Sequence, residues 1–180
     1  MGGGIYIEAA ALERKPLRFE SMMRPALLDL SDSWRVARPA EVSGLAELLD
    51  RDGVRSIRVR GRIRASVRHD CDRCLKELSR DLDGGFDLLF RPMAAIEEGG
   101  EAALSAEQTE VGFYEGGGVA LPDVVREQLL LWLPARSLCQ PDCKGLCPVC
   151  GGDRNEVACS CRETFVDPRW DALRRLRPVH

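Results

Sequence analysis

Six cysteines lie close together in the last third of the printed sequence, and their spacing is typical of a metal site. They are Cys139, Cys143, Cys147, Cys150, Cys159 and Cys161. The two residues between Cys147 and Cys150 let both sulfurs reach one ion, and Gly151 lets the backbone turn so that amides point at sulfur. Thiolates in a tetrahedral set of four select zinc. We therefore predict structural Zn²⁺, as one ion or two.

The six cysteines exceed the four that one zinc needs, so several ligand sets remain open. One ion could leave two thiols over, or two ions could share bridging sulfurs. A further option adds Cys71 and Cys74, because eight cysteines suffice for two separate four-cysteine sites. We expect Cys147 and Cys150 to bind together, with two ligands from the other four of the cluster. Free thiols, disulfides or an iron–sulfur cluster are weaker alternatives. A catalytic zinc is weaker still, because such sites usually include histidine or carboxylate ligands.

The segment Cys71-Asp72-Arg73-Cys74 also has the spacing of a thiol redox motif. Redox use needs a lowered thiol pKa, usually at the start of a helix in a thioredoxin-like unit. Here the pair follows a predicted strand and has acidic neighbours, which oppose thiolate formation. We therefore favour a structural role or a share in metal binding over redox chemistry.

Arginines alternate with apolar residues between residues 57 and 68. This period of two is typical of a strand with one buried face and one wet face. The predicted wet face carries Arg58, Arg60, Arg62, Arg64 and Arg68. Such a row of like charges suits RNA phosphates, although its lack of interleaved aromatic residues argues against base readout. The alternative is a solvated face, or one neutralised by the acidic loop or by Asp81, Asp83 and Asp87.

The chain around these residues divides into a strand-rich part, an acidic part and a helical part. The predicted strands cover residues 5–7, 17–19, 27–30, 57–68 and 78–90, and residues 41–49 have helical spacing. The last two of these strands should form an antiparallel pair with Cys71 and Cys74 near its turn. Residues 92–118 read as a mobile acidic loop, in which 111–114 could pair. A helix should begin near Pro122 and end at Pro134, and a short last helix should begin at Asp167.

The fold class that follows is α+β: an antiparallel sheet, one main helix, an acidic loop and a zinc-binding tail with a short terminal helix. The predicted parts are 1–91, 92–118 and 119–180, with the first and third forming one domain. The sequence has 180 residues and a formal net charge of -3. It shows neither a secretory signal nor an apolar run long enough to span a membrane, so we expect a cytoplasmic protein with reduced thiols.

Several of these segments together resemble one bacterial family, the YceD family of large ribosomal RNA subunit accumulation proteins. The resemblance rests on residues 71–75, on 126–134, on the cysteine tail with Gly145, Gly151 and Asn155, and on the ending 167–173. It covers about the second two thirds of the chain. The resemblance implies a role in producing or stabilising 23S ribosomal RNA, with no defined enzymatic reaction and no catalytic residues to carry over.

Our expectation is a non-enzymatic, zinc-stabilised factor for large-subunit ribosome assembly. Its partners would be ribosomal RNA or a pre-ribosomal particle, or a large-subunit ribosomal protein, with no membrane and no small-molecule substrate. Two alternatives stay open: a thiol-redox protein that uses Cys71 and Cys74, and a zinc-stabilised adaptor that binds proteins.

Overall fold

The computed structural model describes residues 5–51, 53–94 and 111–161, which form two compact units. The first unit contains residues up to Asp70 together with 77–135, and the described part of the second contains 71–76 and 136–161. The elements of the first unit, in chain order, are β1 (Tyr6–Glu8), α1 (Ala9–Leu12), β2 (Leu17–Met23), the 3-10 helix η1 (Pro25–Leu27), β3 (Trp34–Val36), β4 (Ala40–Arg51), β5 (Val54–Asp70), β6 (Glu77–Pro92), β7 (Val111–Tyr114), β8 (Gly118–Ala120) and α3 (Leu121–Trp132).

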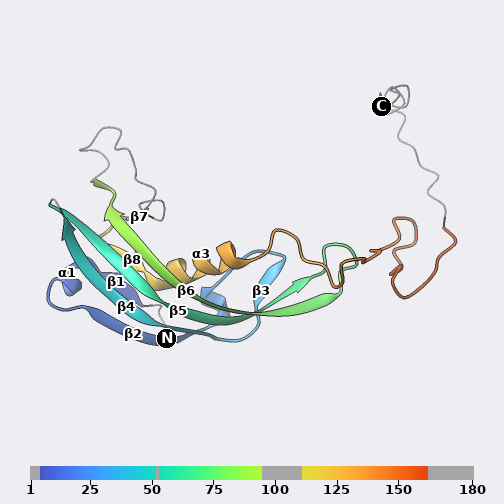
Figure 1. Cartoon of the computed structure of the whole chain (residues 1–180), viewed down its shortest axis with the longest axis horizontal. Coiled ribbons are helices and arrows are strands. Elements are labelled where there is room, and N and C mark those ends of the chain that lie inside the picture. The colour runs from blue at the N-terminus through green and yellow to red at the C-terminus, as the bar shows by residue number, and fades with distance from the viewer. Residues whose placement is uncertain (1–4, 52, 95–110, 162–180) are drawn as a thin grey trace, which may run out of the picture. The chain divides into compact units, whose positions relative to one another are not determined.

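The main sheet of the first unit is six-stranded and mostly antiparallel. Its order is β2-β4-β5-β6-β7, with β3 paired to β5 beyond the end of β4. Only β7 runs parallel to its neighbour β6 among the described pairings, and β1 with β8 forms a separate two-stranded sheet. Figure 1 shows the main sheet curving around α3, which lies along its concave face. The predicted α+β class with one main helix is confirmed.

The alternation along β5 explains why this strand lies at the centre of the sheet. The side chains of Ile57, Val59, Ile63 and Val67 are fully buried, whereas the arginines between them point to the other face. The neighbouring strand β6 pairs with β5 in continuous antiparallel register, from Ile57 opposite Phe90 to Asp70 opposite Glu77. The predicted strand pair is therefore present.

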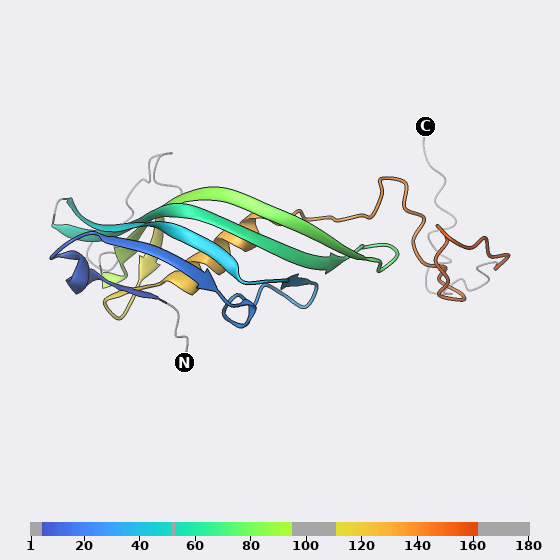
Figure 2. The same cartoon turned by 90° about the horizontal axis from the view of Figure 1, so that it is seen from below.

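Helix α3 covers the buried face, as its apolar spacing predicts. The residues Leu121, Val124, Val125, Gln128 and Leu129 are buried along one side of the helix. The ring of Trp132 lies against Gly84 of β6, where an added Cβ would come within 2.7 Å of the indole. Figure 2, seen from below, places the same helix behind the strands. Glycine at this position thus lets the end of the helix approach the sheet.

The prediction of a helix at residues 41–49 is wrong, because this segment belongs to β4. Its apolar residues fit a helical face, but Ala40 and Val42 of β4 are both buried, and a spacing of two is that of a strand. The strand pairs with β2 on one side and with β5 on the other. Pairing on both edges, which the local sequence does not specify, outweighs the helical preference of a leucine-rich segment.

Residues 27–30 also differ from the prediction, because they form no strand: η1 ends at Leu27 and 28–30 have no regular structure. The ends of the predicted acidic loop are ordered as β6, β7 and β8, while its part 95–110 lies outside the described residues. The predicted terminal helix from Asp167 also lies outside them.

Among the helices that the structure describes, none is long and apolar enough to cross a membrane.

Candidate metal centres and a charged sheet face

The eight cysteines gather into two clusters of four within the described part of the second unit. The first cluster joins Cys71 and Cys74 to Cys139 and Cys143, and the second joins Cys147 and Cys150 to Cys159 and Cys161. In each cluster the four Sγ atoms lie within 4.8 Å of one another. The two-site option is therefore the one that the geometry supports, and Cys147 and Cys150 lie in the same cluster.

Two pairs in the first cluster show how well a metal would fit. The Sγ atoms of Cys71 and Cys143 are 3.8 Å apart, and those of Cys74 and Cys139 are 3.6 Å apart. Both distances exceed a disulfide bond, which is about 2.05 Å. A tetrahedron with zinc–sulfur bonds of about 2.3 Å has edges of about 3.8 Å, from simple geometry. The sulfur spacing of the first cluster thus matches a tetrahedral zinc site.

Backbone geometry explains why Cys-x-x-Cys segments form one half of each cluster. In the first, the amide of Leu75 donates to the carbonyl of Cys71 at 3.0 Å, and in the second the amide of Gly151 donates to the carbonyl of Cys147 at 2.8 Å. These turns place the two sulfurs of each segment on the same side. The other half of the first cluster comes from residues 139–143, whose turn is closed by the amide of Cys143 donating to the carbonyl of Gln140.

The pKa values of two thiols in the first cluster are shifted in opposite directions. Burial opposes ionisation of Cys71, but backbone amides from Arg73, Cys74 and Cys139 outweigh it and lower its pKa to about 6. Burial, followed by the neighbouring thiols, raises the pKa of Cys139 to about 12. One thiolate is thus favoured and another is suppressed, and a bound dication would relieve this conflict.

The second cluster shows the same opposition between its thiols. Hydrogen bonds from the amides of Cys150 and Val149 lower the pKa of Cys147 to about 6. The hydrogen bond with the Cys150 thiol, together with burial, raises the pKa of Cys161 to about 12. The two clusters differ in exposure, since Cys150, Cys159 and Cys161 are exposed while Cys71, Cys74 and Cys143 are buried.

One polar residue of this region was missed as a functional candidate in the sequence. Asn155 lies between two cysteines of the second cluster in the chain, yet its Nδ2 donates to Sγ of Cys143 in the first cluster at 3.4 Å. The sequence shows Asn155 near the cysteines but does not indicate which sulfur it reaches. A hydrogen bond to sulfur is the contact expected of a residue that supports a metal ligand.

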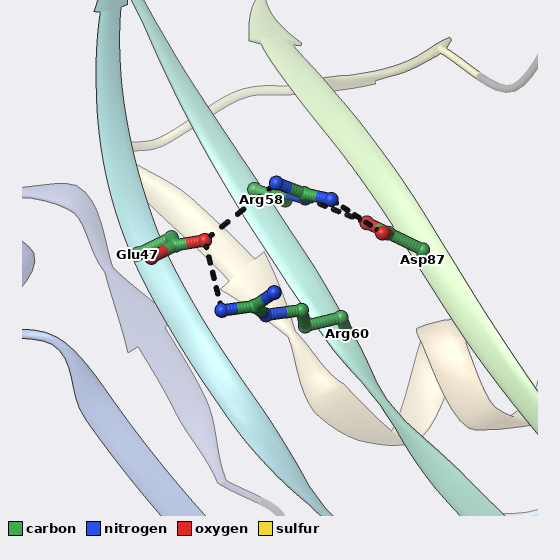
Figure 3. A network of polar contacts seen from close by, with 4 residues as sticks. All are labelled: Glu47, Arg58, Arg60 and Asp87. Atoms are coloured by element: carbon green, nitrogen blue, oxygen red, sulfur yellow. Dashed lines mark hydrogen bonds and ion pairs between the residues drawn. The ribbon is translucent and has the colours of Figure 1, made fainter.

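The five predicted arginines project from one face of β5, and each has a carboxylate nearby. Arg58 pairs with Asp87 at 2.6 Å and Arg62 with Asp83 at 2.6 Å. Figure 3 shows Glu47 of β4 reaching Arg58 and Arg60, at 3.9 and 3.6 Å. The remaining ion pairs join Arg64 to Asp83 and Glu41, and Arg68 to Glu77.

These ion pairs neutralise the arginines of β5 with carboxylates from the neighbouring strands, which is one of the two interpretations of this face. Asp83 and Asp87 pair with arginines of this face, as that interpretation proposed, whereas Asp81 pairs with Arg38 instead. The contribution of Glu41 and Glu47 was missed because their segment was assigned to a helix. Hydrogen bonds from Arg62 and Arg58 lower the pKa of Asp83 and Asp87 respectively, and both carboxylates raise the pKa of these arginines. Contact of this face with RNA stays a prediction.

Comparison with known proteins finds a matching family model and similar mycobacterial proteins. Residues 59–177, which include all eight cysteines, match the family model described as large ribosomal RNA subunit accumulation protein YceD. The chain is 31% identical over 123 residues to the uncharacterized proteins Rv2926c of Mycobacterium tuberculosis and Mb2951c of Mycobacterium bovis. This match covers 64% of the chain and 53% of each relative, so the chain spans about half the length of these curated relatives. No solved structure matches.

Proposed function

Because this chain belongs to the YceD family of large ribosomal RNA subunit accumulation proteins, we propose that it supports the synthesis, processing or stability of 23S ribosomal RNA as a non-enzymatic factor. The observation that carries this proposal is the family match over residues 59–177. That range includes β6, α3 and both cysteine clusters. The factor would act in the cytoplasm, on ribosomal RNA or on a pre-ribosomal particle.

Zinc is the metal that suits both clusters. Each offers four sulfur donors and no oxygen or nitrogen among its ligands, and soft thiolates select zinc over harder cations. Four sulfurs also complete the tetrahedral shell, which is typical of structural sites. We propose Zn²⁺ in both clusters, where it would hold the loops 71–76 and 136–161 in one conformation.

The zinc proposal is tested by counting metal in the purified full chain. We expect about two zinc ions per chain, and about one after Cys74→Ser with Cys139→Ser, or after Cys150→Ser with Cys161→Ser. Ser79→Ala is a suitable control because this residue lies on β6, in the other unit. Metal-free protein from a zinc-replete, reducing preparation would contradict the proposal.

The ribosomal role is tested in the bacterium that encodes the protein. Depletion of the chain should lower 23S relative to 16S ribosomal RNA and reduce large-subunit particles in sucrose gradients. The wild-type chain should restore both, and a variant with both clusters disabled should not. Unchanged 23S RNA after complete depletion would overturn the ribosomal proposal while leaving the metal sites in place.

The arginine face provides a separate test of whether RNA contact is direct. RNA would have to exchange the carboxylate partners of β5 for phosphates. If it does so, Arg60→Gln, Arg62→Gln and Arg64→Gln together should weaken binding and reduce its salt dependence, whereas Asp83→Asn should strengthen binding. Arg38→Gln, which changes an exposed arginine outside β5, is the matched control.

The two alternative functions predict different outcomes. An adaptor that binds proteins through this face would also co-sediment with large-subunit particles. In that case the arginine substitutions would leave any RNA binding by the purified chain unchanged. The redox alternative concerns Cys71 and Cys74, which share their cluster with two further cysteines. This arrangement favours metal binding over dithiol exchange, and disulfide exchange activity in the zinc-loaded protein would argue the other way.

A further inference from the structure

The side-chain amide of Asn155, from the loop between two cysteines of the second cluster, contacts the first cluster. Its Nδ2 donates to Sγ of Cys143 at 3.4 Å and to Oδ1 of Asp153 at 2.6 Å. Its Oδ1 accepts from the backbone amide of Lys144 at 2.8 Å and from Nε2 of Gln140 at 3.3 Å. Three of these four hydrogen bonds thus reach the first cluster or the segment next to Cys143, and the fourth stays within the loop that carries Asn155.

The backbone that carries Asn155 belongs to the second cluster. The residue lies in the loop between Cys150 and Cys159, so metal in the second cluster closes this loop at both ends. The amide of Cys147 donates to the carbonyl of Gly152 at 2.8 Å, and the amide of Arg154 donates to the carbonyl of Gly145 at 3.0 Å. These bonds attach the loop to the short segment that separates Cys143 from Cys147. A metal ion in the second cluster would therefore restrict the position of Asn155 further.

The bond from Asn155 to Cys143 matters because a thiolate ligand concentrates negative charge on sulfur. An N–H donor stabilises this charge and holds the sulfur in the orientation that the metal needs. Cys143 is 1% exposed, so water cannot readily take the place of the amide. Loss of such a supporting contact typically costs a metal site about 10- to 100-fold in affinity.

We propose that Asn155 couples the two metal sites: zinc in the second cluster holds Asn155 in place, and Asn155 then strengthens zinc binding in the first cluster through Sγ of Cys143. This inference rests on the proposed zinc binding. Linkage requires the effect to be reciprocal, so metal in the first cluster also favours metal in the second. Asn155 acts here as a positioning residue and is itself no ligand.

The test follows each cluster separately in the full-length, zinc-loaded chain. Protein is titrated with a zinc chelator, free cysteines are alkylated, and mass spectrometry reports the alkylation of Cys143 and of Cys150 on different peptides. We expect Asn155→Ala to lower the chelator concentration that half-exposes Cys143 by about 10-fold or more. Gln140→Ala is the control, because it removes a contact to the same amide and leaves the bond to sulfur intact.

Coupling is measured by disabling the second cluster with Cys159→Ser and Cys161→Ser. This change should weaken protection of Cys143 to a similar degree in the wild-type background, and should add little in the Asn155→Ala background, because the link is already lost. Full additivity of the two changes would overturn the proposal. So would unchanged protection of Cys143 in Asn155→Ala.

A second variant covers the case in which Asn155→Ala disorders the whole loop. Asn155→Asp keeps an acceptor for Lys144 but replaces the N–H groups that reach Sγ of Cys143 and Oδ1 of Asp153 with a carboxylate oxygen. We expect Cys143 to lose protection in this variant as well, and protection of Cys143 equal to that in the wild-type chain would refute the coupling. Immediate alkylation of all cysteines in wild-type protein, with or without zinc, would instead refute the zinc proposal itself.

Discussion

Leu75 holds a backbone conformation that glycine normally adopts. Its φ is 59°, and Gly151, at the matching position of the second cluster, has a φ of 71°. Each residue follows the second cysteine of a Cys-x-x-Cys segment and donates its amide to the carbonyl of the first. The left-handed region costs a residue with a Cβ about 1–2 kcal/mol. The side chain of Leu75 is 63% exposed, so its burial offsets little of that cost.

The change Leu75→Gly is therefore expected to stabilise the zinc-loaded protein by up to about 1 kcal/mol, after the entropy cost of glycine is subtracted. Chemical denaturation that follows the second unit measures this change in the free energy of unfolding. Leu131→Gly is an opposite-sign control that is followed by unfolding of the first unit, because Leu131 is 69% exposed within α3 of that unit, where glycine costs about 1 kcal/mol. A loss of stability in Leu75→Gly would show that the leucine side chain contributes packing.

At the residue scale, the sequence predicted that Cys147 and Cys150 lie together but not how the other cysteines are grouped. Close spacing identified Cys147 with Cys150, because two residues between cysteines suffice to close a turn around one ion. It could not show that Cys139 and Cys143 join Cys71 and Cys74, since that contact depends on how distant segments meet. Cys139 and Cys143 are close in the chain to the second cluster, yet they belong to the first.

The strands β4, β5 and β6 are joined on one face by ion pairs that fix their register. Asp87 accepts two hydrogen bonds from Arg58, at 2.8 and 2.6 Å, although Asp87 lies directly opposite Arg60. Arg64 lies directly opposite both Glu41 and Asp83 and pairs with each. A slip by one residue would move these side chains to the other face, so the pairs favour a single register.

The pH dependence of these pairs has a definite sign. The pKa of Asp87 is lowered in the folded protein by the hydrogen bond from Arg58. Its contribution to stability is thus present above the unfolded pKa, about 4, and is lost as the pH falls through the lowered folded value. We expect Asp87→Asn to reduce the denaturation midpoint at pH 7, and the difference from wild type to shrink below pH 4.

A matched change, Asp50→Asn near the end of β4, separates this effect from the general loss of a negative charge. It should shift the midpoint less than Asp87→Asn at pH 7. A difference between Asp87→Asn and wild type that stays constant from pH 7 to pH 3 would contradict the ion-pair explanation.

The contact between β4 and β5 depends on two glycines that lie opposite each other. A Cβ added to Gly44 would come within 2.2 Å of the carbonyl oxygen of Arg60 and 2.6 Å of the Phe19 ring. The backbone oxygen cannot move without disturbing the pairing of β5. We expect Gly44→Ala to destabilise the first unit by about 1–3 kcal/mol, as overpacking typically does. Thermal unfolding followed by circular dichroism measures this loss.

Gly85→Ala is the control for this substitution. An added Cβ at Gly85 would meet its nearest neighbour, the carbonyl oxygen of Gly61, at an ordinary 3.6 Å. This variant should therefore unfold close to the wild-type temperature. Equal destabilisation by both changes would mean that any side chain at a strand glycine is harmful, and the close approach at Gly44 would lose its significance.

At the element scale, the spacing of apolar residues predicted the strands with one buried face. It failed where the same apolar residues fit both a helix and a strand. The alternation along β5 is unambiguous, because polar residues, mostly arginines, alternate with apolar ones from Ile57 to Arg68. In β4, Leu45, Leu48 and Leu49 complete a helical stripe with Val42, so the same residues fit either structure. The pairing of β4 with strands on both sides decides between them, and such pairing is a property of the whole sheet.

At the scale of the whole molecule, the two units differ in what stabilises them. The hydrophobic core of the described residues, from Ile7 to Leu129, belongs to the first unit. The buried apolar residues described in the second unit are Cys71, Cys74, Cys143 and Cys147. A small segment without an apolar core usually needs metal or disulfides to stay folded. Its cysteines are free thiols, and the proposed zinc ions would supply that order.

Removal of zinc should consequently unfold the second unit and leave the first one folded. Hydrogen exchange with mass spectrometry can test this prediction in the full chain. After chelation under reducing conditions, the amides of Leu146, Cys147 and Gly151, which donate to backbone carbonyls, should lose protection. The amides of Ile57 and Val59 in β5 should keep theirs, because their strand pairs on both sides over a buried face.

Restoring zinc should return protection to the second unit, which would separate metal loss from irreversible damage to the thiols. If residues 143–151 stayed protected without metal, side-chain and backbone contacts alone would suffice to order this unit. If β5 lost protection at the same chelator concentration, the first unit would depend on the metal as well. Selective and reversible loss in the second unit is the result expected when coordination replaces a hydrophobic core as the source of folding free energy.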